Sequence, residues 1–118
     1  MLNQAIVIAD KAGVIRMWSG GAESLFGYDA AAAVGQTLDV IVPPDYREHH
    51  WRGFRAAMEG DNRTIDRASV NVPALTRSGN ILRLAVRLLV IRDAHESIVG
   101  AMAIFVPDDV SQSSLPKL

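Results

Sequence analysis

Two adjacent histidines, His49 and His50, are the residues of this sequence best placed to do chemistry. They fall within residues 44–59, the one segment whose pattern predicts a helix of several turns. Adjacent helical positions diverge by about 100°, so the two imidazoles cannot easily bind one metal ion. His50 lies near the centre of the apolar face, and His49 points away from it. His50 is therefore either an inward-facing ligand for a bound group or a half-buried histidine whose ring bonds a backbone carbonyl or water.

Apolar residues surround His50 on the predicted helix. Tyr46, Gly53, Phe54 and Ala57 fall within about 100° of arc around it. Large side chains in several segments could line a flavin or another flat ligand, or they could serve ordinary core and interface packing. These side chains are Trp18, Trp51, Phe54, Phe105 and Met102.

The predicted helix needs a surface against which its apolar face can pack, and the remaining segments predict a β-sheet. Strands are predicted at 5–9, 14–18, 64–75, 81–91 and 98–106. Three short helical segments, 22–26, 30–33 and 38–42, lie between the first two strands and the long helix. Pro73 indicates an edge position or a bulge in its strand. We expect an α+β fold, in which helices cover one face of a five-stranded antiparallel sheet and a cavity can form between them.

Composition excludes several classes of protein. The 118 residues are enough for one domain, and 49% of them are hydrophobic. Without cysteine there is no disulfide, no thiolate metal site and no chromophore attached to a thiol. Twelve basic and thirteen acidic residues leave a net charge of −1, which argues against a broad nucleic-acid footprint. No nucleophile, phosphate-loop or zinc-protease motif is present, so we expect no enzyme.

No segment is typical of a membrane protein. The longest apolar run, residues 98–106, is far too short to cross a bilayer. The chain opens without a basic, apolar and small-residue leader. We therefore expect a cytoplasmic protein, or a domain of one, that contacts neither membrane nor nucleic acid.

The order and spacing of several short motifs resemble the PAS domain. The stretches 6–10 with 13–15, 21–28, 34–36, 42–43 and 77–79 match it, and Asp109-Val110-Ser111 resembles the junction with which PAS domains end. The resemblance implies a PAS domain over residues 1–111, followed by a flexible tail at 112–118. PAS domains are sensor and interaction modules, so it also implies signalling.

Within this resemblance, the predicted helix is similar to that of haem-binding PAS oxygen sensors. Those proteins carry a Pro-x-x-x-Arg-x-x-His pattern whose histidine is the proximal haem ligand, and Pro43, Arg47 and His50 match it without a gap. The resemblance implies haem b, with His50 bound to the iron and Tyr46 and Phe54 among the surrounding residues.

The sequence departs from those sensors on the distal side. A Met or Arg on the strand after the helix serves the distal ligand there, but the matching positions here are Ala68 and Val70. Neither side chain ligates iron or donates a hydrogen bond, so carbon monoxide, nitric oxide or redox sensing fits better than stable oxygen binding. Arg83 and Arg87 could pair with haem propionates or another anion, or lie on a solvated or dimeric sheet face.

Two hypotheses of function follow. The first is a sensory PAS domain that binds a small ligand or cofactor between helix and sheet and passes the change to an output domain, such as a kinase or transcription regulator. The second is a ligand-free interaction module. Strands 81–91 and 98–106 are apolar at nearly every position, which predicts that a second copy covers the outer sheet face as a homodimer.

Overall fold

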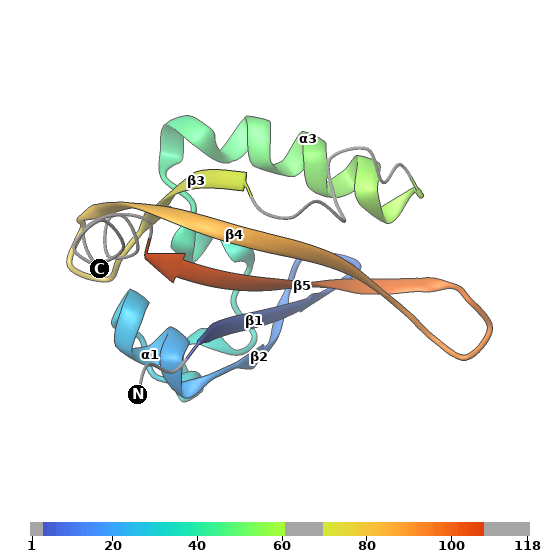
Figure 1. The fold of residues 1–118 in the computed structure, drawn as a ribbon, viewed down its shortest axis with the longest axis horizontal. Helices are drawn as coiled ribbons and strands as arrows, with labels where there is room; N and C mark the ends of the chain where they lie inside the picture. Colours follow the sequence, from blue (N-terminus) through green and yellow to red (C-terminus); the bar gives the residue numbers. More distant parts are fainter. Residues whose placement is uncertain (1–3, 61–69, 108–118) are drawn as a thin grey trace, which may run out of the picture.

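The computed structural model describes residues 4–60 and 70–107 as a five-stranded antiparallel sheet covered by helices (Figure 1). The strands follow the order β2-β1-β5-β4-β3 across the sheet. They are β1 (Ala5–Asp10), β2 (Ile15–Trp18), β3 (Val70–Leu75), β4 (Ile81–Arg92) and β5 (Ile98–Pro107). The predicted α+β fold is confirmed. Ala68, the first part of the predicted strand 64–75, the Asp109–Ser111 junction and the tail 112–118 lie outside the described residues.

Short helices connect β2 to the longest helix. They are α1 (Gly20–Phe26), α2 (Ala30–Ala33) and the 3₁₀ turns η1 (Leu38–Ile41) and η2 (Pro44–Tyr46). The side chain of Ser19 accepts a hydrogen bond from the Ala22 backbone at the start of α1, and Gly27 ends that helix in the left-handed conformation (φ 90°). Asp29 caps α2 in the same way, so local side-chain chemistry sets these boundaries.

The predicted helix over residues 44–59 is divided in two. The turn η2 comes first, and α3 (Arg47–Met58) follows it. Proline at the first position suits a helical start, but the backbone N–H of Arg47 bonds the Pro44 carbonyl three residues back, which is 3₁₀ geometry. Gly60 adopts a φ of 100° and closes the segment, as the sequence predicted.

Alternation along the strands separates two faces of the sheet. The inner face, which the helices cover, carries the buried side chains of the core. These include Val7, Ala9, Leu84, Val86 and Phe105. Figure 1 shows α3 lying along this sheet, while the long β4–β5 hairpin reaches beyond the other strands. Ala57 and Met58 form a smaller cluster against this hairpin.

The outer face carries the two arginines that the sequence analysis considered for an anion. Arg83 and Arg87 are exposed and alternate with the buried Leu84 and Val86, so they point away from the helices. Of the two alternatives from the sequence, this position disfavours pairing with a ligand held between helix and sheet and agrees with a solvated or dimeric sheet face. Pro73 lies on β3, an edge strand, as predicted, because a proline has no N–H to donate to a neighbour.

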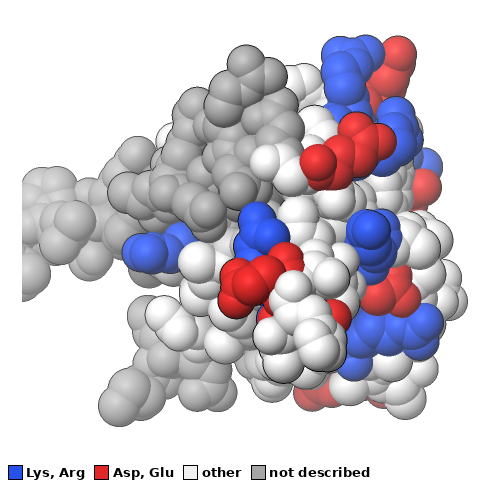
Figure 2. All heavy atoms as spheres, turned by 90° about the vertical axis from the view of Figure 1, so that its right-hand side faces the viewer, with Lys and Arg blue, Asp and Glu red and all other residues white. Residues whose placement is uncertain are grey.

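Charged side chains of both signs occur together on one end of the molecule. On the end of the molecule drawn in Figure 2, basic and acidic side chains are interspersed, and neither sign forms a broad area of its own. Among the helices of residues 4–60 and 70–107, none is long and apolar enough to cross a membrane.

Candidate functional site

A cavity of about 530 Å³ lies between α3 and the inner face of the sheet. This volume is within the range of small-molecule sites. Small residues create the space, since each occupies a wall position where a larger side chain would fill the centre. They are Ala9, Gly53, Ala56, Ala57, Ala74, Ala101 and Ala103. Most of the remaining wall is apolar, from Val7 on β1 to Phe105 on β5.

His50 extends from α3 into this wall. Its ring is half-buried, and its Nδ1 atom is buried without a hydrogen-bond partner among residues 4–60 and 70–107. Loss of water around the ring lowers the pKa of His50 below its ordinary value of 6.5, and His49 lowers it further, whereas the Asp39 carboxylate raises it. The imidazole is therefore neutral at pH 7, with a ring nitrogen that the described residues leave unsatisfied.

The second histidine has a different environment. His49 is exposed at the rim of the cavity, where its ring centroid lies 4.8 Å from that of Tyr46. The His50 ring instead faces Phe54, at 6.1 Å and nearly parallel. Among residues 4–60 and 70–107, no group of three or more metal-ligating side chains is present.

Most of the residues that the sequence analysis placed at the site are in the cavity wall. Tyr46, His50, Phe54, Val70 and Met102 all line it. Met102 contributes least, because alternation along β5 directs its side chain to the outer face, beside its partners Ile8 on β1 and Leu89 on β4. Ala68 lies outside the described residues.

The two tryptophans have structural roles away from the cavity. Trp18 donates a hydrogen bond of 2.8 Å to the Tyr28 carbonyl and packs against Phe26. The indole of Trp51 lies over Gly13, where any added Cβ would collide with the ring. Neither ring lines the cavity, so of the two alternatives from the sequence the tryptophans serve packing, whereas Phe54 and Phe105 do line the cavity.

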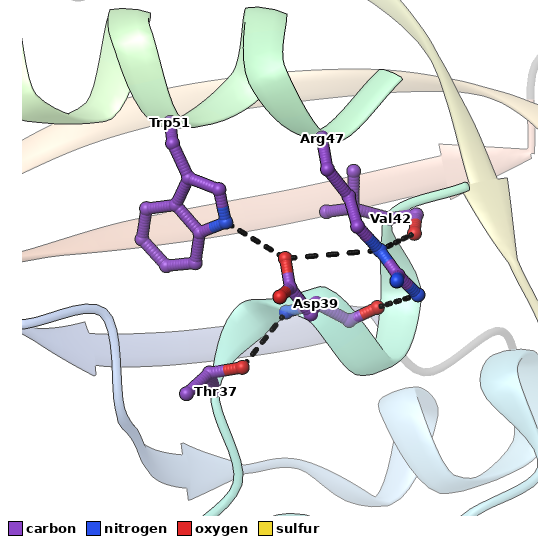
Figure 3. A network of polar contacts seen from close by, with 5 residues as sticks. All are labelled: Thr37, Asp39, Val42, Arg47 and Trp51. Carbon is purple, nitrogen blue, oxygen red and sulfur yellow. Dashed lines mark hydrogen bonds and ion pairs between the residues drawn. The ribbon is translucent and has the colours of Figure 1, made fainter. Parts of the chain in front are cut away.

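A network of polar contacts attaches α3 to the turn η1 (Figure 3). The indole Nε1 of Trp51 donates to Asp39 Oδ1 at 2.7 Å. Arg47 donates to the carbonyls of Val42 and Asp39 at 3.0 and 3.2 Å, and its Nε lies 3.8 Å from Asp39 Oδ1. The Asp39 N–H donates to Thr37 Oγ1 at 3.3 Å. Asp39 thus contacts both Arg47 and Trp51, whose side chains extend from α3 toward η1.

Sequence analysis found Arg47 through its motif but missed Asp39 and the role of Trp51. The two residues are 12 positions apart and lie on different elements. The only local signal is the Thr37 cap two residues before Asp39, which positions the turn without indicating its partner.

Comparison with known proteins agrees with this architecture. The family model described as the PAS fold matches residues 2–107. The chain belongs to the PAS family. PAS domains are sensory and interaction modules, so the functional question for this PAS domain is what its cavity holds.

The curated relatives match this chain over a short part of their own length. Sensor protein FixL of Bradyrhizobium diazoefficiens is 35% identical over 49 residues, which are 42% of this chain and 10% of that protein. The chain spans about a tenth of the length of the curated relatives it matches, 11% and 10%.

Solved structures show the same fold. The PAS domain of a protein from Colwellia psychrerythraea has a TM-score of 0.76 and 27% identity, covering 88% of this chain and 85% of that one. The PAS domain of the quorum-sensing receptor RpfR from Cronobacter turicensis, in complex with C12:0, has a TM-score of 0.73 and 18% identity, covering 92% of this chain and 96% of that one.

We expect Asp39 and Trp51 to stabilise the fold as a pair. Asp39→Ala removes the acceptor and Trp51→Phe removes the donor while keeping a ring near Gly13. Each single change should lower the free energy of unfolding by about 1–3 kcal/mol. The double variant should lose about 1 kcal/mol less than the sum, as measured by urea unfolding in a double-mutant cycle. Strict additivity of the two losses would show that the hydrogen bond contributes nothing.

The lowered pKa of His50 predicts a dependence of stability on pH. The unfolded chain protonates this histidine near pH 6.5, whereas the folded state does so only at lower pH. The contribution of His50 is therefore complete above pH 6.5 and is lost as the pH falls through the folded pKa. Urea unfolding at pH 7.5 and 5.5 should show a smaller acid loss for His50→Gln than for the wild type. His95→Gln, in an exposed turn, is the control and should behave like the wild type; equal acid losses in all three proteins would contradict the prediction.

Proposed function

We propose that this chain is a sensory PAS domain that holds haem b in the cavity, with His50 as the ligand of the iron. The observation that carries the proposal is the buried, unpartnered Nδ1 of a neutral histidine in the wall of an apolar cavity. A neutral imidazole in an apolar wall offers a ring lone pair as a ligand for iron.

Two other observations support the same assignment. The sequence pattern formed by Pro43, Arg47 and His50 resembles that of haem-binding PAS oxygen sensors, and one relative is a sensor protein, FixL. The aromatic rings of Tyr46 and Phe54 line the cavity on either side of His50 along α3. A flat apolar group suits such walls.

The residues of this cavity fit haem in kind. When bound, haem would supply an iron that binds a diatomic gas or changes its oxidation state. His50 would hold the group, because its neutral imidazole offers a lone pair. The apolar residues of the wall would exclude water from it. Arg47 and Trp51 would keep the helix, and with it His50, in place through their contacts with Asp39.

The inner face of β3 would define the other side of the pocket. Its cavity-lining side chains are Val70, Val72 and Ala74, none of which donates a hydrogen bond. A diatomic ligand that needs a donor is disfavoured there, whereas carbon monoxide and nitric oxide are not. We therefore propose that the signal sensed is carbon monoxide, nitric oxide or a change of redox state.

The signal would leave through the sheet. Ala101, Ala103 and Phe105 line the cavity from β5, which pairs with both β1 and β4. A ligand that favours one packing of these side chains would shift the central strand relative to its neighbours. The recipient would be an output domain, such as a kinase or a transcription regulator, or a second copy of the chain.

Haem binding is testable by absorption spectroscopy. Protein purified from haem-supplemented cells should show a Soret band at roughly 400–430 nm, as expected for a haem iron held by histidine. His50→Ala should lose this band or bind haem at least about tenfold more weakly, because the axial ligand is gone.

The neighbouring His49→Ala is the matched control, since it changes an imidazole at the rim and should retain the spectrum. Unfolding curves of both variants would show that each is folded. The proposal fails if the wild type stays colourless after addition of haem, or if His50→Ala keeps the wild-type spectrum and affinity.

A specific observation on the outer sheet face favours a second candidate function, an interaction module that forms a homodimer. One row of apolar side chains crosses four adjacent strands, formed by Met17, Ile8, Met102 and Leu89 in that order. A second row, Ile6 and Ile104, lies beside it and ends at Arg87. A sheet face of this composition is suited to burial against a second protein surface.

If this face joins two copies, a charge at the end of the row should separate them. Met17 is 37% exposed, and Met17→Glu should weaken self-association at least about tenfold, because the carboxylate would be buried without a partner. Val34→Glu is the control, because Val34 is 42% exposed and lies outside the sheet. Light scattering over a range of concentrations measures the effect. A monomeric wild type at high concentration would exclude the homodimer.

A further inference from the structure

The charges around the cavity share one sign. Among the described residues that line it, the ionisable bases are His49, His50 and Arg52, and none is an aspartate or glutamate. The deep wall is apolar, with Val7, Ala57 and Val86 almost fully buried. A ligand of this cavity therefore meets hydrocarbon inside, and the permanent charge it meets is the guanidinium of Arg52.

The charged and polar side chains that line the cavity lie along one edge of it. His49 and Arg52 are three positions apart on α3, and Ala56 is four positions after Arg52. This spacing places the three residues on one flank of the helix. His49 and Arg52 are both exposed, whereas Gly53 and Ala57 face the interior. The cavity thus has an apolar interior and a polar, positively charged rim.

The existing partner of Arg52 does not hold it firmly. Its Nη2 lies 3.3 Å from the Glu48 carboxylate one turn earlier, but the two side chains are 70% and 87% exposed. An exposed pair of this kind contributes little free energy and is readily exchanged. Arg52 is therefore available to a ligand, while its position at the rim keeps it out of the apolar interior.

We propose that the ligand of this cavity is an amphipathic carboxylate, whose apolar body occupies the interior and whose carboxylate is bound by Arg52. A guanidinium binds a carboxylate with two parallel hydrogen bonds, which makes arginine selective for this group. A cationic end group would be repelled at the same place, and an uncharged one would gain no ion pair. This inference rests on the proposed function only in requiring that the cavity take a ligand.

Two chemical sources share these features: an acyl chain with a terminal carboxylate and a porphyrin with carboxylate side chains. Dodecanoate and metal-free protoporphyrin IX are suitable probes of each, because neither contains iron and neither depends on ligation by His50. Dodecanol matches dodecanoate in its chain but has no charge.

The experiment compares the wild type with Arg52→Gln and with Arg55→Gln. Arg55 is an exposed arginine on the same helix that does not line the cavity, so its replacement changes the net charge equally. Backbone amide NMR signals of Gly53 and Ala57 report occupancy of the cavity, and their titration gives the affinity. Fluorescence follows protoporphyrin IX.

We expect Arg52→Gln to weaken binding of at least one carboxylate probe about three- to tenfold, the effect of a charge-assisted hydrogen bond at a partly exposed site. Arg55→Gln should bind that probe like the wild type. For an acyl ligand, dodecanol should bind equally to all three proteins. The probe whose affinity depends on Arg52 identifies the source.

Three results would overturn the proposal. The first is an equal effect of Arg52→Gln and Arg55→Gln on binding, and the second is no shift of the Gly53 and Ala57 signals with either carboxylate probe. The third is that dodecanol binds as tightly as dodecanoate while the affinity for protoporphyrin IX does not depend on Arg52. These outcomes are independent of the haem experiment. A His50→Ala variant that retains haem would refute iron ligation by His50 and leave the role of Arg52 in binding carboxylates intact.

Discussion

The contact between the Trp51 indole and the Asp39 carboxylate determines where α3 lies, and the cavity depends on that position. It attaches the helix to η1 rather than to the centre of the sheet. Arg47 reinforces the attachment one helical turn earlier, and Gly13 provides the space in which the indole lies. These interactions hold the first turns of α3, while Ala57 and Met58 near its end pack against the β4–β5 hairpin, and the cavity lies between helix and sheet. A helix held only by apolar burial would instead pack at close range, because protein interiors approach crystalline density.

The composition of the wall preserves that volume. Alanine and glycine on α3, β1, β3 and β5 face one another across it, so few contacts bridge the gap. This arrangement lacks the dispersion energy that larger side chains would provide. The Nδ1 atom of His50 also has no hydrogen-bond partner among the described residues. The loss of dispersion energy is reduced when a ligand with an apolar body fills the space. The same cavity thus links the stability of the fold to occupancy, which a sensory domain requires.

The two sheet faces divide the functions proposed for this PAS domain. Alternation along β5 directs Ala101 and Ala103 toward the cavity and Met102 toward the outer row. A change of packing on one face therefore moves residues on the other by way of the same backbone. Ligand binding and association with a second protein surface are compatible in this geometry, because they use opposite sides of the same strands.

The sequence alone indicated the family, the order of elements and the inward orientation of His50, and it limited Pro73 to an edge position or a bulge. These features depend on residues close together in the chain: glycine and proline conformations, capping side chains and the 3.6-residue period of one helix. The tertiary structure decided the rest. It paired Asp39 with Trp51, placed Arg83 and Arg87 on the outer face, moved both tryptophans away from the cavity and brought Arg52 to its rim. The places of Asp39, Trp51 and Arg52 depend on how α3 sits on the sheet, and those of Arg83, Arg87 and Trp18 depend on which sheet face the helices cover. Both come from contacts between distant residues, which local propensity and periodicity do not encode.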